Sequence, residues 1–182
     1  MTSAKAILSH FHKDPAKDGN NPKQLNPDLL KGAIAGCVAA PLRSNADSRG
    51  HLIELTTMRD EAAPIVHVYQ VFAESLSVRA WVYHAKQADR LAFTNGAFRI
   101  ALLDLREDSP TYGNLATLTA GAELPIILTI PPFVAHGVQN IGSDMASFVN
   151  CPTAVYDRSD PDKYRLPPDS PLITFEWETR TP

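Results

Sequence analysis

The stretch DRLAFTNGAFRIALLDL, residues 89–105, consists of two apolar runs separated by a short polar turn. Each run has the length and apolar content of an ordinary β-strand. Asn95-Gly96 lies between them, and this dipeptide is typical of two-residue hairpin turns because both residues accept a positive φ. The stretch therefore predicts a β-hairpin in which the two apolar runs pair with each other.

Runs of the same kind recur along most of the chain. About ten short segments, rich in Val, Ile, Phe and Thr, are bounded by Gly, Pro, Asn or Asp. That punctuation is typical of strands, and strands at such short spacing indicate an all-β sandwich or barrel. Helical periodicity is scarce, and the proline-rich segment 157–172 predicts an irregular loop packed on the barrel.

The length of 182 residues is enough for one domain with a sizeable core. Residues 1–30 are polar and rich in Gly, Pro, Asn and Asp, which predicts an N-terminal arm, and we expect residues 31–182 to form a single domain. Cys37 and Cys151 form no paired framework, so both are expected to be buried free thiols.

Charge and hydropathy exclude some partners. The formal net charge is −3 and the sequence pI is about 6.0, so no basic face for nucleic acid is expected. No run approaches the roughly 18 apolar residues that cross a bilayer, and no secretory apolar region is present. The sequence predicts a cytoplasmic protein without a nucleic-acid or membrane partner.

Two histidine-containing motifs say more about the protein family than composition does. Val-Tyr-His at 82–84 is followed by Asp89 and then by a glycine, and PPFVAHGVQN at 131–140 carries a second histidine and an asparagine. The spacing resembles the paired motifs of the cupin superfamily. It departs at Val82, where the first motif has its leading histidine, and at Phe133, where the second has glycine.

A narrower resemblance covers roughly residues 33–158. The segments that carry it occur in one order: DSRGHLIEL (47–55), VYQVF (68–72), VRAWVY (78–83), LDLREDSPTYG (103–113) and IPPFVAHG (130–137). They are similar to the dTDP-4-dehydrorhamnose 3,5-epimerase family. The resemblance implies a cupin double-stranded β-helix, or jelly-roll barrel, in a homodimer that exchanges strands. It also implies a nucleotide-sugar ligand, no metal or other cofactor, and deprotonation of C3 and C5 beside a 4-keto group.

The departures from this family concern its proton-transfer residues. Val82 stands at the position of the base histidine, Ile100 at that of its supporting aspartate, and Val149 at that of the acid tyrosine. The catalytic lysine aligns with Asp89, or with Arg90 after a slip of one residue. Aliphatic side chains cannot hold and release a proton, so we expect standard 3,5-epimerase chemistry not to be encoded. Whether the chain is an enzyme stays open at this point.

The resemblance also implies substrate-binding residues. Arg49 and Arg79 fall on positions that contact the diphosphate or nucleotide, and a planar guanidinium suits phosphate. Glu54 falls on a position that touches the base from the partner subunit, and Gln70 on an amide position. Tyr156 is either a lid over the pocket or a surface residue.

His84 and His136 are the candidates for any remaining catalysis. Strand alternation puts His84 on the face of Val82, so His84 is the candidate base on a keto sugar, with His136 across the barrel. Two alternatives remain. His84, Asp89 and His136 form a two-histidine, one-carboxylate set suited to iron(II) or manganese in a metal-dependent cupin. The second alternative is that the chain is a non-catalytic, dimeric ligand-binding cupin.

Overall fold

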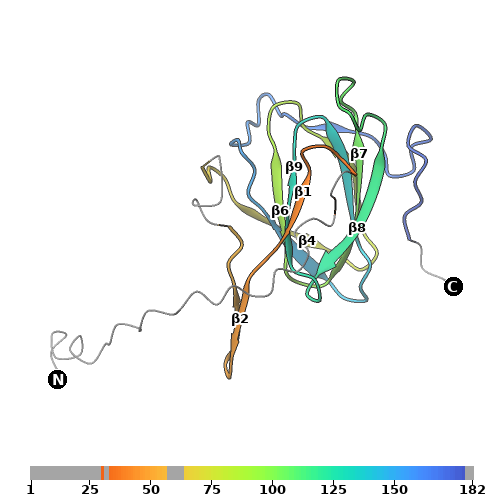
Figure 1. The fold of residues 1–182 in the computed structure, drawn as a ribbon. Helices are drawn as coiled ribbons and strands as arrows, with labels where there is room; N and C mark the ends of the chain where they lie inside the picture. Colours follow the sequence, from red (N-terminus) through yellow and green to blue (C-terminus); the bar gives the residue numbers. More distant parts are fainter. Residues whose placement is uncertain (1–29, 31–32, 57–63, 179–182) are drawn as a thin grey trace.

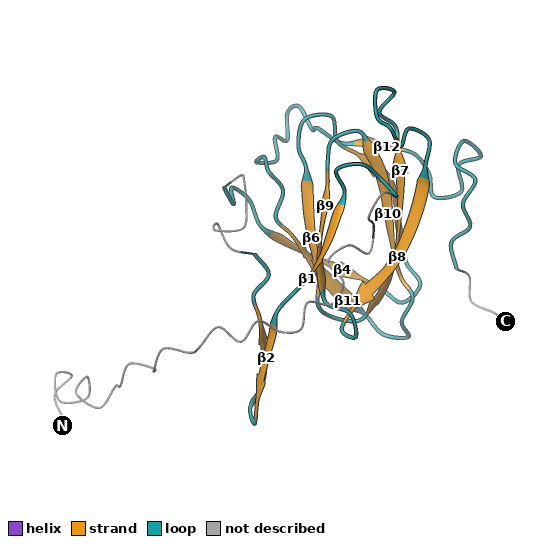
Figure 2. Ribbon diagram, in the orientation of Figure 1, coloured by secondary structure: helices purple, strands orange, loops and turns teal. Residues whose placement is uncertain are grey.

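The computed structural model describes residues 30, 33–56 and 64–178, so the predicted N-terminal arm lies outside the described residues except for Leu30. These residues form twelve strands and no helix (Figure 2). Among them, accordingly, there is no helix that is long and apolar enough to cross a membrane.

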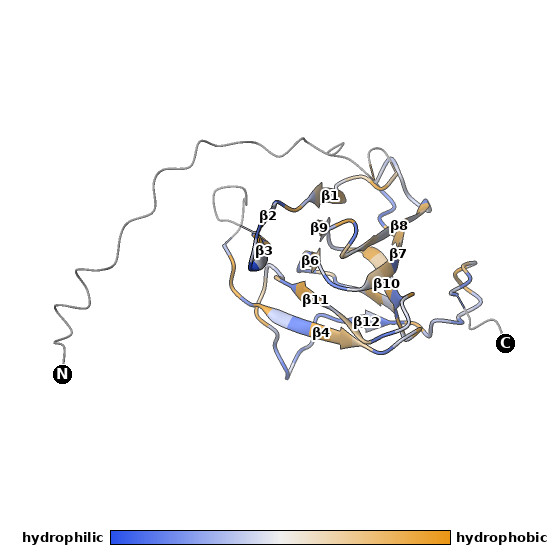
Figure 3. Cartoon of the chain, turned by 90° about the horizontal axis from the view of Figure 1, so that it is seen from below, coloured by the Kyte–Doolittle hydropathy of each residue, from blue (hydrophilic) through white to orange (hydrophobic). Residues whose placement is uncertain are grey.

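Ten of the strands form two antiparallel five-stranded sheets that face each other around the interior, as Figure 3 shows. The first sheet has the order β1 (Val38–Pro41), β9 (Ile126–Ile130), β6 (Asp89–Phe93), β11 (Ala146–Asn150) and β4 (Tyr69–Ala73). The second has the order β12 (Tyr164–Arg165), β5 (Val78–Tyr83), β10 (Val134–Asn140), β7 (Ala97–Asp104) and β8 (Leu115–Gly121). The predicted all-β jelly-roll is confirmed.

The predicted hairpin at residues 89–105 is wrong. β6 pairs with β9 and β11, whereas β7 pairs with β10 and β8, so the turn carries the chain from one sheet to the other. Gly96 has a positive φ of 68°, but Asn95 does not, and a two-residue hairpin turn of the Asn-Gly type needs both. Asn95 instead accepts a hydrogen bond from the Ser147 amide, and the Gly96 carbonyl accepts one from the Ala122 amide.

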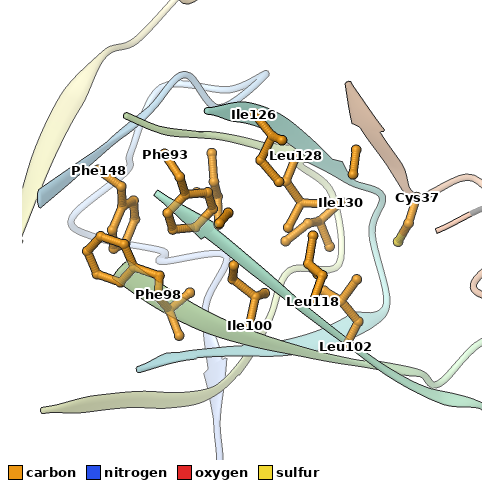
Figure 4. Close-up of a cluster of buried hydrophobic side chains, with 14 of the residues drawn as sticks. Cys37, Phe93, Phe98, Ile100, Leu102, Leu118, Ile126, Leu128, Ile130 and Phe148 are labelled. Atoms are coloured by element: carbon orange, nitrogen blue, oxygen red, sulfur yellow. The ribbon is translucent and has the colours of Figure 1, made fainter. Parts of the chain in front are cut away.

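An apolar core fills part of the space between the sheets (Figure 4). Phe93, Phe98 and Phe148 pack against one another at one side of this core, with ring centroids 5.0 to 5.6 Å apart. Cys37 belongs to this core, and both cysteines are buried free thiols, as predicted. Burial raises the pKa of Cys37 to about 12, which makes the thiol inert at neutral pH.

The C-terminal segment packs on the outer face of the second sheet. Phe175 and Trp177 contact Trp81 of β5, with ring centroids 5.6 and 5.3 Å from that of Trp81. The prediction of an irregular segment packed on the barrel is confirmed, with the short strand β12 added at its middle.

A polar network holds the loop after β7. The Asp104 carboxylate accepts hydrogen bonds from Arg106 Nε and Nη2 at 2.7 and 2.8 Å, and from the hydroxyls of Ser109 and Thr111 at 2.6 Å each. Arg106 and Thr111 in turn bind the carbonyl and the amide of Ala35. The distinctive DLREDSPTYG segment therefore fastens the chain that leads into β1, which is a structural role.

The remaining two strands, β2 (Ser44–Asp47) and β3 (Gly50–Ile53), form a hairpin that projects away from the barrel (Figure 1). They pair only with each other among the described strands. The turn between β2 and β3, which forms the tip of the hairpin, contains Arg49.

Candidate functional site

A cavity of about 450 Å³ lies between the two sheets. Part of its wall is apolar, including Val71, Val78, Val82 and Val138. Its polar lining comes from strands of both sheets and from the segment around β12: Tyr69, Arg79, His84, Asp89, His136, Asn150, Lys163 and Arg165.

His84, Asp89 and His136 form a compact buried cluster in this cavity. Asp89 begins β6, His84 follows directly after β5, and His136 lies in β10, opposite Val82 in the register of β5. Asp89 Oδ2 lies 3.2 Å from His84 Nε2 and 3.4 Å from His136 Nε2, and the three side chains are at most 10% exposed. The fold thus brings together the three residues that the two sequence motifs predicted as neighbours.

The far ring nitrogens of both histidines fix their tautomers. His84 Nδ1 contacts the carbonyl oxygen of Asp162, and His136 Nδ1 lies 3.2 Å from that of Val134. A carbonyl oxygen only accepts hydrogen bonds, so each Nδ1 carries the proton. Each neutral ring then turns the lone pair of Nε2 toward a carboxylate oxygen. These two contacts are attractive only with an additional proton or a metal ion between the atoms.

Asp89 is ionised. Burial alone would raise its pKa, but the close contacts of its carboxylate with the His136 and His84 rings outweigh burial and hold the pKa well below its usual range. Its other oxygen, Oδ1, accepts hydrogen bonds from the side-chain amide of Gln87 at 3.0 Å and from the side-chain amide of Asn150 at 3.1 Å. For His84, burial alone would lower the pKa. The contact with Asp89 has the larger effect, so the pKa of His84 is raised.

The segment before β12 holds this cluster from outside the barrel. Asp162 accepts three backbone hydrogen bonds through its carboxylate, from the amides of Ala85, Lys86 and Gln87 at 2.8 to 3.0 Å. Its carbonyl oxygen meets His84. One residue of the C-terminal segment therefore fixes both the β5–β6 turn and the orientation of the histidine.

Tyr69 is a phenol in the cavity that sequence reasoning missed. Its hydroxyl accepts a hydrogen bond of 2.8 Å from Asn150, the residue that also binds Asp89. Burial and the Asp89 charge raise the pKa of Tyr69, so the hydroxyl stays protonated and its own hydrogen remains to be donated. The only signal in the sequence was its place beside Gln70 in the VYQVF segment.

Cationic side chains line the same cavity. Lys163 and Arg165 enter it from the segment around β12, and Arg79 from β5. Burial, followed by the charge of Arg165, lowers the pKa of Lys163. Lys163 and Arg165 were also missed, because they belong to a proline-rich segment with no regular pattern.

The aliphatic residues at the family's proton-transfer positions differ in their placement. Val82 lines the cavity, on the same side as His84. Ile100 is fully buried in the apolar core. Val149 is not among the cavity-lining residues, whereas its neighbours Phe148 and Asn150 are.

Of the predicted binding residues, only Arg79 lines the cavity of its own chain. Arg49 is 87% exposed and forms an ion pair with Asp47 at the hairpin tip. Glu54 is exposed, Gln70 donates a hydrogen bond to Ser147, and Tyr156 is half exposed outside the cavity lining. Their roles in binding stay predictions.

Comparison with known proteins agrees with this architecture. A family model described as dTDP-4-dehydrorhamnose 3,5-epimerase matches residues 31–181. The probable low-salt glycan biosynthesis epimerase Agl13 of Haloferax volcanii is 36% identical over 140 residues, 75% of this chain and 89% of that protein. The spore coat polysaccharide biosynthesis protein SpsL of Bacillus subtilis is 34% identical over 149 residues, 80% of this chain and 97% of that protein.

A solved structure, a dTDP sugar isomerase from Desulfovibrio desulfuricans, superimposes with a TM-score of 0.75 at 27% identity. The match covers 80% of this chain and 92% of that one.

Proposed function

Because the chain belongs to the dTDP-4-dehydrorhamnose 3,5-epimerase family, we propose that it binds a nucleotide-linked keto sugar and exchanges a proton beside the ketone. One observation carries the proposal: a single cavity holds a buried His-Asp-His cluster together with several cationic side chains. The chemistry uses no histidine at position 82, so its outcome differs from standard 3,5-epimerisation.

The cations of the cavity wall suit the diphosphate. Arg79 and Arg165 are guanidinium groups, which bind phosphate oxygens in a bidentate manner. With the diphosphate between them, the sugar lies toward His84 and His136.

The cluster acts on the ketone as an electrophile. The contacts of the two Nε2 atoms with Asp89 require a proton at each contact or one divalent metal ion, and either gives the cluster a net charge of +1 rather than a free base. Positive charge at this point stabilises the oxyanion that forms when a proton leaves the neighbouring carbon. We therefore assign His84 and His136 to the ketone oxygen, in place of the base role predicted for His84.

Lys163 is the proposed proton acceptor. It lines the cavity, and its lowered pKa increases the fraction of neutral amine near pH 7, which is the form that accepts a proton. Lys163→Met is expected to slow solvent deuterium exchange beside the ketone by about 100-fold or more, with dTDP binding little changed. Proton NMR of a dTDP-linked 4-keto sugar in D₂O measures the exchange, and calorimetry with dTDP measures binding.

Lys163→Arg is the matched control. The arginine keeps the positive charge but cannot accept a proton near neutral pH, so Lys163→Arg is also expected to bind dTDP and to lose the exchange. Exchange at the wild-type rate in Lys163→Met would remove Lys163 from the mechanism. Absence of any binding heat with millimolar dTDP would end the nucleotide-sugar proposal.

A homodimer explains the projecting hairpin. The β2–β3 hairpin forms its own two-stranded sheet among the described strands and carries Arg49 away from the cavity of its own chain. We propose that the hairpin reaches a second copy, where Arg49 and Glu54 complete the nucleotide end of the partner's cavity.

A further inference from the structure

We propose that His84, Asp89 and His136 bind a divalent first-row transition-metal ion. The proposal goes beyond the nucleotide-sugar function and is tested without any sugar. It starts from the two Nε2–carboxylate contacts, which the tautomers of the histidines leave without a bridging hydrogen.

The distances match the ligand shell of one ion. Metal–nitrogen and metal–oxygen bonds of about 2.0–2.2 Å place neighbouring ligand atoms about 3 to 3.5 Å apart. Asp89 Oδ2 lies 3.2 and 3.4 Å from the two Nε2 atoms, and one ligand atom from each residue lies within 4.8 Å of the others. Two histidines and one carboxylate form a set that leaves further coordination positions open.

Each of the three side chains is also held as metal ligands are held. Histidines that bind a metal through one ring nitrogen donate the other ring N–H to a carbonyl or carboxylate, and ligating carboxylates accept further hydrogen bonds. Asp162 and Val134 supply those carbonyls, while Gln87 and Asn150 donate to Asp89 Oδ1. Orientation of all three side chains is therefore fixed before any ion arrives.

One ion satisfies the cluster better than two protons. With protons on both Nε2 atoms, two cationic rings with centroids 6.0 Å apart would share one carboxylate away from water. Like charges at this distance repel strongly in a buried site. A divalent ion replaces both protons, lets the two rings stay neutral, and keeps the proton of each ring on Nδ1, as the two carbonyl contacts require.

The open side of the site faces the cavity. His84, Asp89 and His136 are all among the residues that line it, so a bound ion would be reachable by a ligand there. When bound, the ion would supply a Lewis acid for a carbonyl oxygen.

The experiment uses the full chain without a histidine tag, freed of metal with a chelator and titrated with Co²⁺. We expect one equivalent to bind, measured by equilibrium dialysis, with visible absorption bands of a nitrogen- and oxygen-ligated ion. Zn²⁺ should displace it. His84→Gln, His136→Gln and Asp89→Asn should each weaken binding by about 100-fold or more, because each removes one of three ligands.

His51→Gln is the matched control, since His51 is an exposed histidine on the projecting hairpin. The double variant His10→Gln/His12→Gln controls for the two N-terminal histidines, whose spacing could itself attract an ion. Both variants should bind as the wild type does. Asn150→Ala should weaken binding by about 10- to 100-fold, the effect expected of a group that orients a ligand.

A second measurement covers the case in which ligand variants fail to fold. In wild-type protein with ¹⁵N-labelled histidine, Zn²⁺ should shift the Nε2 signals of two histidines that carry their proton on Nδ1. Binding of less than about a tenth of an equivalent would overturn the proposal. Undiminished binding in Asp89→Asn, or shifts confined to His10 and His12, would overturn it equally.

Discussion

Asp104 is a buried carboxylate whose negative charge is balanced by Arg106 of the following loop. Burial alone would raise its pKa, but hydrogen bonds from Arg106, Ser109 and Thr111 outweigh burial and hold the pKa well below its usual range. A depressed pKa contributes stability that is present above the unfolded-state value near 3.8 and is lost as the pH falls through the folded-state value. Asp104 thus favours the folded state at neutral pH and ceases to do so in strong acid.

Asp104→Asn is expected to lower the free energy of unfolding at pH 7 by about 3 kcal/mol, because it leaves Arg106 without its buried partner. The loss should shrink below pH 4, where the wild-type carboxylate itself begins to lose its advantage. Urea unfolding at pH 7 and at several values below 4 measures both. A variant that loses as much stability at low pH as at pH 7 would contradict the linkage.

Single-residue chemistry at the site was predictable only where a motif or strand alternation applied. Alternation correctly separated Val82 and His84, which line the cavity, from Tyr83, which stacks between Tyr164 and Phe133 outside it. Phe133, at the glycine position of the second cupin motif, has a positive φ of 58°, a backbone conformation that ordinarily favours glycine. Lys163 could not be predicted, because no local pattern says where an irregular segment will fold back.

At the scale of elements, the turn from β6 to β7 shows why the hairpin prediction was wrong. Asn95-Gly96 reports a turn, but the pairing of the flanking strands depends on β9, β10 and β11, which lie far along the chain. In a jelly-roll, consecutive strands often belong to opposite sheets. Local turn chemistry therefore indicates where the chain bends, and long-range pairing decides which strands become neighbours.

Gly96 lies in this turn, and Gly113, which lies after β7, is its matched control. Both have positive φ, of 68° and 76°. A Cβ at Gly96 would lie 2.2 Å from that of Ala146, whereas a Cβ at Gly113 would meet nothing within 4 Å. Gly113→Ala should cost about 1–2 kcal/mol from backbone strain alone. Gly96→Ala should cost about 2–5 kcal/mol, because overpacking adds to the strain.

Thermal and urea unfolding of the two variants, measured side by side, checks the difference. Equal losses of stability would mean that the close approach between the β6–β7 turn and β11 does not constrain the fold.

At the scale of the whole molecule, the barrel was predictable from regularly spaced strands and the two histidine motifs. The packing of the proline-rich segment on the barrel was predictable too, but the contribution of its residues Lys163 and Arg165 to the cavity lining was not, since prolines and polar residues carry no periodicity. Arg49 and Glu54 lie outside the cavity of their own chain. Their predicted role therefore requires a second copy.

Mixing two defective variants tests the homodimer. Arg49→Ala keeps an intact cavity, and Lys163→Met keeps an intact hairpin, so a heterodimer would contain one complete site. If dimers reassort at random, about a quarter of the sites should recover proton exchange. Solvent exchange measured before and after mixing, beside sedimentation of the wild type, gives the result. No recovery from a protein that sediments as a reassorting dimer would place Arg49 outside the partner's site.

Asp162, Lys163 and Arg165 lie within four residues of the C-terminal segment, yet Asp162 orients a histidine while Lys163 and Arg165 line the cavity. The barrel strands and these three residues of the C-terminal segment therefore belong to separate stretches of the chain. Exchanging residues 157–178 between related proteins, together with Trp81, which contacts Trp177, offers a route to new specificity in which the other nine strands of the two sheets stay as they are. Changes confined to this C-terminal segment of some twenty residues would alter the cavity lining with the least change to the barrel strands.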